Sequence, residues 1–301
     1  MGLKIVKAEQ PLTVEQIIVM MYGQPGIGKT TIAFSAEAPL CLDFDRGAHR
    51  AANRQDSVPI GSWAEVATLD AEDLAEYSTV IVDTVGRALD SLTAHLIQQD
   101  PKMANRSGAL TLQGYGALKS TFAQWLKNLR ELGKDVILIA HDAEDKSGDD
   151  LIVRPDVQGG SRGEIIKSAD AIGYLYRASK KTMLDFNPSD RWIAKNPSKF
   201  EALTVPSIDA HGGFMAETIQ GIKDAINEMT EAQRETAEEL AQWRERFELL
   251  ETVEQFNAMI PETGSASKPI QGDVKRMLVQ VGGDKGFRFN SEVKEFEHVE
   301  A

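Results

Sequence analysis

Residues 23–30 read Gly-Gln-Pro-Gly-Ile-Gly-Lys-Thr and match the pattern G-x-x-x-x-G-K-[ST] at every fixed position. In this pattern the glycines let backbone N–H groups curl around phosphate oxygens, and the lysine brings a positive charge to the β- and γ-phosphates. The threonine hydroxyl binds Mg²⁺, and the helix that follows adds a partial positive charge at its N-terminus. The expected nucleotide contacts are Gly23, Gln24, Pro25, Gly26, Ile27, Gly28, Lys29, Thr30 and Thr31. The segment therefore predicts a site for a nucleoside triphosphate with Mg²⁺.

Residues 79–84 (TVIVDT) supply a carboxylate that such a site needs. The apolar residues before Asp83 are typical of a strand buried in a parallel sheet, and ligands bind at the carboxyl ends of such strands. We expect Asp83 to hold the magnesium ion through water, so that Thr30 and Asp83 form the predicted metal site. A strand-end aspartate that caps a loop is the alternative.

Hydrolysis also needs a group that positions or deprotonates the attacking water. Asp43 and Asp45 lie at the end of the apolar run 40–44 (LCLDF), and because strand side chains alternate, we expect one of the two to face the site. His141 follows the apolar residues 136–140 (VILIA) and could contact the γ-phosphate through a ring nitrogen. Lys29 and His141 are thus predicted catalytic residues, with a structural histidine as the alternative for His141.

The elements that position these residues alternate along the chain. Apolar runs predict six strands, at 17–21, 40–44, 79–83, 136–140, 171–176 and 192–194. Helical patterns predict helices between them, at 30–38, 91–99 and 114–132. Strands that alternate with helices indicate right-handed β-α-β crossovers and an α/β fold with a mostly parallel sheet flanked by helices.

After residue 218 the sequence changes character. Charge-rich helical segments are expected at 219–229, 231–250, 252–259 and 272–281, and a short strand at 286–289. Residues 261–269 (PETGSASKP) have the composition of a linker. We therefore expect a nucleotide-binding core at residues 1–218 and a small, mainly helical C-terminal region at residues 219–301, with a linker near 261–269.

Composition limits the class of protein. The chain has 301 residues, 42% of them hydrophobic and 26% charged, which is an ordinary globular composition. Its single cysteine, Cys41, excludes a disulfide framework and a cysteine-based zinc site. The longest apolar run, 17–22, is too short to cross a bilayer, and the N-terminus does not resemble a signal peptide. We expect a soluble, cytoplasmic protein with no membrane partner.

The net charge of −13 is unevenly distributed. Residues 217–301 hold 18 acidic and 10 basic residues, whereas residues 101–134 hold six basic and one acidic, and residues 151–200 hold nine basic and five acidic. Charge runs are most often solvated surface. The alternative is that the two basic segments bind nucleic acid.

Residues 15–205 resemble the RecA-type recombinase ATPases, and within them the short RecA-like ATPases of bacteriophages that anneal single-stranded DNA. Asp45 matches the catalytic glutamate that ends a strand in RecA, and the shorter aspartate leaves the hydrolysis rate open. His141 falls where relatives carry a polar γ-phosphate sensor. The resemblance implies a RecA-like P-loop fold and an ATPase that uses ATP and Mg²⁺, with Asp45, Lys29 and His141 as its catalytic residues.

The resemblance also implies DNA contacts, because two loops at the carboxyl edge of the sheet bind DNA in this family. The first corresponds to 102–113, with Lys102 and Arg106 as candidates. The second follows His141 and ends near Gly159-Gly160-Ser161-Arg162, with Arg162 as a candidate. Both lie within or beside the basic segments, and contacts of this kind give salt-sensitive binding that does not depend on sequence.

Lys195 and Lys199 resemble the lysines by which one RecA subunit reaches the nucleotide of its neighbour, although their spacing differs. The implied partners are single-stranded DNA, further copies of the chain in a ring or filament, and a single-stranded-DNA-binding protein, in the cytoplasm of a bacterial host. The expected function is ATP-dependent annealing or recombination, with DNA stimulating the ATPase.

One alternative is a RecA-like regulatory ATPase that acts through protein partners without DNA. Another is a small-molecule kinase, which the lack of an arginine-rich lid segment disfavours.

Overall fold

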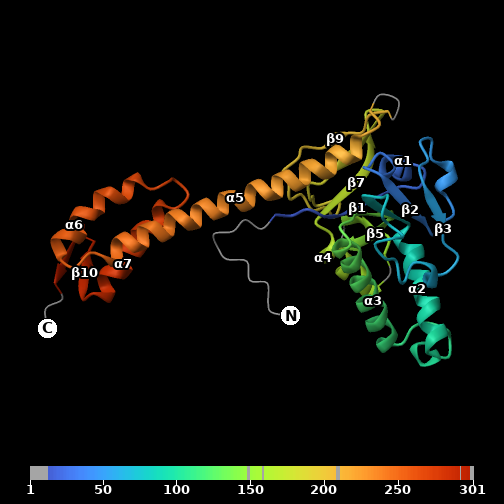
Figure 1. Ribbon diagram of the computed structural model, residues 1–301, viewed down its shortest axis with the longest axis horizontal. Coiled ribbons are helices and arrows are strands. Elements are labelled where there is room, and N and C mark those ends of the chain that lie inside the picture. The colour runs from blue at the N-terminus through green and yellow to red at the C-terminus, as the bar shows by residue number, and fades with distance from the viewer. Residues whose placement is uncertain (1–12, 148–149, 158, 208–210, 292, 299–301) are drawn as a thin grey trace. The chain divides into compact units, whose positions relative to one another are not determined.

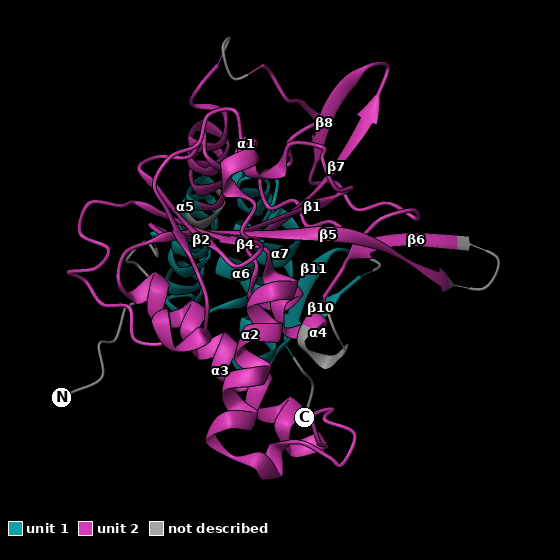
Figure 2. Cartoon of the chain, turned by 90° about the vertical axis from the view of Figure 1, so that its right-hand side faces the viewer, with its two compact units in different colours: residues 1–13, 227–301 teal, residues 14–226 magenta. Residues whose placement is uncertain are grey.

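The computed structural model describes residues 13–147, 150–157, 159–207, 211–291 and 293–298. The chain forms two compact units, one of residues 14–226 and one of residues 1–13 and 227–301 (Figure 2). The boundary between residues 226 and 227 falls inside one long helix, α5 (Phe214–Glu248). The boundary expected from the sequence, between residues 218 and 219, lies eight residues earlier, where the sequence becomes rich in charge.

A nine-stranded sheet forms the centre of the larger unit (Figure 1). Its strands are β1 (Ile18–Gly23), β2 (Pro39–Asp43), β3 (Ser57–Pro59), β4 (Thr79–Asp83), β5 (Asp135–Ser147), β6 (Asp150–Pro155), β7 (Ala171–Ala178), β8 (Lys181–Asp185) and β9 (Leu203–Thr204). Their order is β3-β2-β4-β5-β1-β7-β8-β9, and β6 pairs with β5. The pairings from β3 to β7 are parallel, whereas β6, β8 and β9 pair antiparallel to their neighbours. The expected mostly parallel α/β sheet is confirmed.

The central strands are buried on both faces because their residues are continuously apolar. Alternate side chains pack to opposite sides: Met20 and Val82 join a core that includes residues of α2 (Val85–Gln99) and α3 (Leu112–Glu131). Val19 and Ile81 join a second core that includes residues of α1 (Lys29–Ala33) and the start of α5. Helices therefore cover both faces, as expected, and α4 (Gly159–Ser168) packs beside α3.

The expected strand at 192–194 is wrong. Trp192 and Lys195 form isolated bridges only, and the antiparallel strand after β7 is β8. β8 follows a two-residue turn in which Ser179 and Lys180 both have positive φ, at 47° and 67°. Such turns usually carry glycine or asparagine, so Ser179 and Lys180 do not resemble a turn in sequence. The helix expected at 30–38 is also shorter, since α1 ends at Ala33.

The smaller unit contains the end of α5, then α6 (Val253–Glu262), α7 (Gln271–Asp284) and the hairpin of β10 (Phe287–Asn290) and β11 (Glu295–His298). It has its own core, which includes Trp243, Phe247, Phe256 and Phe296. The expected mainly helical C-terminal region is thus confirmed. None of the helices that the structure describes is both long enough and apolar enough to cross a bilayer.

The segment at 261–269 differs from the expected linker. Pro261 lies in the last turn of α6, and residues Thr263–Ser265 form a short 3-10 helix. Ala266 is buried in the core of the smaller unit, at 5% exposure. The hydroxyl of Thr263 donates to the carbonyl of Ile260, so the small polar residues that resemble a linker in composition are used to end a helix.

Candidate functional site

The phosphate-binding loop joins β1 to α1, as the sequence predicts. Gly26 and Gly28 have φ angles of 76° and 103°, in the left-handed region that glycine adopts without steric cost. Gly23, at the end of β1, is paired with His141 of β5 and with Leu175 of β7. The loop is therefore held at the carboxyl edge of the sheet, between two strands.

Lys29 is buried beneath this loop, at 6% exposure. Its Nζ donates to the carbonyl oxygens of Gly23 at 2.7 Å and Gln24 at 2.9 Å. A third contact joins Nζ to Nδ1 of His141 at 3.4 Å. Burial lowers the pKa of Lys29 to about 8, and the carboxylates of Asp142 and Asp83 oppose that shift. The ammonium thus has three partners within the chain, all at the place where phosphate oxygens would approach.

Thr30 and Asp83 meet in the predicted metal site. The hydroxyl of Thr30 donates to Oδ2 of Asp83 at 2.7 Å. Burial raises the pKa of Asp83, the bond from Thr30 opposes this, and Asp43 and Asp45 raise it further. A hydroxyl and one carboxylate, completed by water and phosphate oxygens, are the ligands that Mg²⁺ prefers, so the residues fit this ion. Within the described ranges, no cluster of three or more His, Cys, Asp or Glu side chains offers a different metal site.

The two aspartates after β2 have different environments. The carboxylate of Asp43 is 4% exposed and accepts the backbone N–H groups of Gly47 and Ala48, at 2.9 Å each. Asp45 instead lines the pocket and lies 3.5 Å from Nη2 of Arg50 and 3.7 Å from Nε of Arg87. Of the two carboxylates, Asp45 is therefore the one that can reach a water molecule in the pocket.

His141 also lines the pocket, at the point where β5 leaves the central sheet. Its pKa is lowered by burial first and by the neighbouring Lys29 second, so the ring is neutral at pH 7. Because the lysine ammonium can only donate, Nδ1 of His141 must accept, which assigns the ring proton to Nε2. The Nε2–H group of His141 can then donate to a ligand in the pocket.

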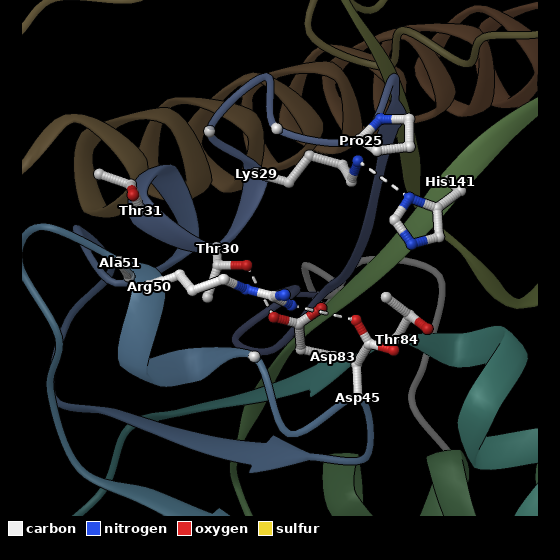
Figure 3. A pocket seen from close by; sticks show the side chains of 13 residues that line it. Pro25, Lys29, Thr30, Thr31, Asp45, Arg50, Ala51, Asp83, Thr84 and His141 are labelled. Carbon is white, nitrogen blue, oxygen red and sulfur yellow. Dashed lines mark hydrogen bonds and ion pairs between the residues drawn. The ribbon is translucent and has the colours of Figure 1, made fainter.

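These residues line a single cavity of about 510 Å³ (Figure 3). It is lined by Pro25, Gly26, Gly28, Lys29, Thr30, Thr31, Asp45, Gly47, Arg50, Ala51, Asp83, Thr84 and His141. The sequence does not predict Arg50, because a lone arginine seven residues after the end of β2 belongs to no motif. A second cavity, of about 630 Å³, shares Gly28 and Thr31 with the first. Its walls include Ile27, Ile32 and Val205, and its polar groups include those of Asn53 and Lys181.

Lys102 and Arg106 are not among the residues around the pocket. Lys102 lies in the short 3-10 helix Pro101–Met103 and Arg106 follows it in the connection between α2 and α3, and both are exposed. Figures 1 and 2 both place this connection at the end of α2 and α3 that lies away from α1. These two side chains are accessible, but they are separate from the nucleotide pocket.

Arg162 lies in α4, where its Nη1 is 2.8 Å from Oδ2 of Asp145. Arg154 of β6 forms an ion pair with the same carboxylate. The expected second loop is therefore largely a hairpin of β5 and β6, and one acidic residue of that hairpin pairs with two arginines.

Lys195 and Lys199 are both exposed and lie outside the pocket. The Nζ of Lys195 donates to the carbonyl of Ala169 at 2.7 Å, and its backbone bridges to Ile172 of β7. Ile172 is paired with Met20 of β1, toward the amino ends of these strands. Lys195 therefore lies near the amino ends of these strands, whereas the phosphate-binding loop lies at their carboxyl ends.

A mostly parallel sheet with a phosphate-binding loop after β1, and with a strand-end aspartate bonded to the threonine of that loop, is the arrangement of a P-loop ATPase. A family model described as an AAA domain (AAA_24) matches residues 15–198. The chain belongs to this family. The expected kinship to RecA-like P-loop ATPases is confirmed.

Two kinds of relative were found. Over 229 residues the chain is 28% identical to the SPbeta prophage-derived uncharacterized protein YorG of Bacillus subtilis (strain 168), which covers 72% of this chain and 68% of that protein. Among solved structures it is similar to the KaiC-like protein PH0186 of Pyrococcus horikoshii OT3, at 13% identity and a TM-score of 0.34, covering 57% of this chain and 78% of that one. The flagellar accessory protein FlaH of Methanocaldococcus jannaschii matches at 12% identity, with the same TM-score of 0.34 and the same coverage of 57% and 78%.

Proposed function

We propose that the protein binds and hydrolyses ATP with Mg²⁺, and that it uses this cycle in the annealing of single-stranded DNA. The observation that carries the first part is the convergence of Lys29, Asp45, Asp83 and His141 on one cavity. Asp83 ends β4, Asp45 follows β2, and Lys29 begins the helix after β1. His141 lies where β5 leaves the central sheet. In open α/β sheets, ligands bind at the edge formed by the carboxyl ends of the parallel strands.

In this proposal the triphosphate lies in the first cavity and the nucleoside in the second. The second cavity combines apolar walls with a few polar groups, as sites for nucleobases do. Phosphate oxygens replace the carbonyls of Gly23 and Gln24 as partners of Lys29, because an ammonium bonds more strongly to an anion than to a neutral carbonyl. The exchange also compensates the burial of the ammonium group, which lowers the pKa of Lys29.

Hydrolysis follows from the same arrangement. Asp45 orients a water molecule and accepts its proton as the water oxygen bonds to the γ-phosphorus, and the bond from that phosphorus to the bridging oxygen breaks to release ADP and phosphate. Nε2–H of His141 donates to the γ-phosphate. Thr30 and Asp83 would hold Mg²⁺, which neutralises charge on the phosphate oxygens.

The proposed annealing of single-stranded DNA is supported by charge and by a relative of the chain. The exposed cations Lys102 and Arg106, the basic segments of the chain and the prophage origin of YorG favour it. The pairing of Arg162 with Asp145 favours the second candidate, a regulatory ATPase that acts through protein partners, because this pairing neutralises a cation that DNA would otherwise contact.

An ATPase assay with and without single-stranded DNA tests both parts. The protein should hydrolyse ATP in the presence of Mg²⁺, and Lys29→Ala should bind ATP at least roughly tenfold more weakly, because a charged hydrogen bond is worth about 1.5–3 kcal/mol. Unchanged nucleotide affinity in this variant would contradict the site. Stimulation by single-stranded DNA, lost when Lys102 and Arg106 are both replaced by alanine, supports annealing. An ATPase rate that is the same with and without single-stranded DNA supports the regulatory ATPase.

A further inference from the structure

Arg50 extends its side chain across the pocket toward Asp83 and Asp45 (Figure 3). It ends the 3-10 helix Ala48–Arg50, which follows β2. Its Nη2 lies 3.5 Å from Oδ2 of Asp45, the carboxylate that the proposed mechanism uses to orient water. A permanent cation thus lies beside this carboxylate in the cavity assigned to the triphosphate.

The backbone before Arg50 is shaped to allow this position. The carboxylate of Asp43 accepts the N–H groups of Gly47 and Ala48, which fixes the start of the 3-10 helix. A Cβ atom added at Gly47 would lie 2.2 Å from Nη2 and 3.1 Å from Cζ of Arg50. The missing side chain at residue 47 therefore leaves the space that the guanidinium occupies.

The ion pair between Arg50 and Asp45 is weak. The Arg50 side chain is 68% exposed, the contact is 3.5 Å long, and exposed pairs of this kind contribute little to stability. A phosphate group offers more negative charge and a geometry that matches the planar guanidinium in a bidentate contact. A triphosphate in the cavity therefore competes well for Arg50.

We propose that Arg50 binds the γ-phosphate of ATP within its own chain. When ATP enters, the guanidinium leaves Oδ2 of Asp45 for the terminal phosphate. The carboxylate keeps its ion pair with Arg87 through Oδ1, and Oδ2 can then orient the attacking water. Without a γ-phosphate the guanidinium returns to Asp45. This inference rests on the proposed ATPase function, and it assigns to one residue both the recognition of ATP over ADP and the release of Oδ2 of Asp45.

Two variants and one control test it. Arg50→Ala removes the guanidinium, and Gly47→Ala keeps the charge but fills the space it needs. The clash in Gly47→Ala is with the far end of a flexible side chain, so the backbone is retained. Arg54→Ala is the control, because Arg54 is exposed in the same connection and does not line either cavity.

Affinities for ATP and ADP are measured by titration calorimetry, and kcat and KM by phosphate release. Both test variants should lose roughly 10- to 100-fold in ATP affinity with little change for ADP, and kcat should fall as well, as expected for a charged hydrogen bond to the γ-phosphate. The control should match the parent. Equal losses for ATP and ADP, an unchanged preference for ATP, or a higher kcat in Arg50→Ala would overturn the role of Arg50. A parent protein that neither binds nor hydrolyses ATP would overturn the proposed function itself.

Discussion

At the scale of single residues, the site is defined by polar groups that already have partners inside the chain. Lys29 donates to two carbonyls and contacts His141, and Thr30 donates to Asp83. Motif and spacing predicted that these residues would meet. They could not predict which aspartate after β2 faces the pocket, because strand alternation stops applying where β2 ends, at Asp43. That outcome is set by Asp43 capping the backbone of Gly47 and Ala48.

Lys29 gives the nucleotide affinity a predictable pH dependence. Burial lowers its pKa to about 8, so it is charged below that pH and loses its charge above it. ATP affinity should therefore be level from pH 7 to 8 and then fall by up to about tenfold per pH unit, since binding requires the lysine to regain a proton. Binding titrations between pH 7 and 10 measure this. Lys29→Arg, which stays charged, should remove the fall; a parallel fall in both proteins would contradict the assignment.

The same shift has the opposite sign for folding. The unfolded chain holds the Lys29 proton up to its ordinary pKa of 10.5, whereas the folded chain without nucleotide releases it near 8. Between these values the unfolded state binds more protons, so this residue makes the free energy of unfolding rise with pH. Affinity and stability should thus move in opposite directions over that range.

At the scale of elements, buried strands were the most predictable features and antiparallel additions the least. β1, β2, β4, β7 and the inner half of β5 lie within a few residues of the apolar runs that predicted them. β6, β8 and the outer half of β5 were missed because their sequences, such as DLIVRP and KTMLD, mix polar and apolar residues. A strand of mixed composition forms because a neighbouring strand in the fold pairs with it. The local sequence pattern does not show which segment that neighbour is.

The hairpin of β5 and β6 permits a test of the DNA contact at this scale. Asp145 pairs with Arg154 and Arg162, and these two arginines hold its pKa below the usual range. Asp145→Asn removes the competing charge, so affinity for single-stranded DNA should increase and the slope of log affinity against log salt should steepen by about one unit.

The matched control is Glu144→Gln, the exposed neighbour on the same strand, which forms none of these pairs. Fluorescence anisotropy with a labelled oligonucleotide at several salt concentrations gives both slopes. If Asp145→Asn and Glu144→Gln shift the curve equally, the effect is one of net charge and the hairpin does not contact DNA.

At the scale of the whole molecule, the described residues form separate hydrophobic cores in the two units. Phe256 is fully buried in the core of the smaller unit. Phe256→Ala should destabilise that unit by about 3–5 kcal/mol, the usual cost of emptying such a site. Nucleotide affinity of residues 14–226 should be unchanged, because the pocket lies within the larger unit.

Denaturant unfolding followed by tryptophan fluorescence and by nucleotide binding separates the two units. Trp243 lies in the smaller unit, whereas Trp63, Trp125 and Trp192 lie in the larger one. The part of the fluorescence change that is lost in Trp243→Phe therefore reports on the smaller unit, and bound nucleotide reports on the larger one. Leu249→Ala is the control, since this leucine is 74% exposed. A single transition that shifts as a whole in Phe256→Ala would show that the units unfold together, contrary to the prediction.

β5 runs without interruption from Asp135 in the central sheet to Ser147 in the hairpin, and His141 lies where the strand leaves the sheet. An extended strand can hardly be lengthened further, because its rise is already about 3.3 Å per residue. The five residues from His141 to Asp145, four steps along the strand, therefore form a stiff connection about 13 Å long. Tension applied at the hairpin passes through the backbone of His141. Force on the outer surface and the proposed contact of His141 with the γ-phosphate would therefore involve the same strand.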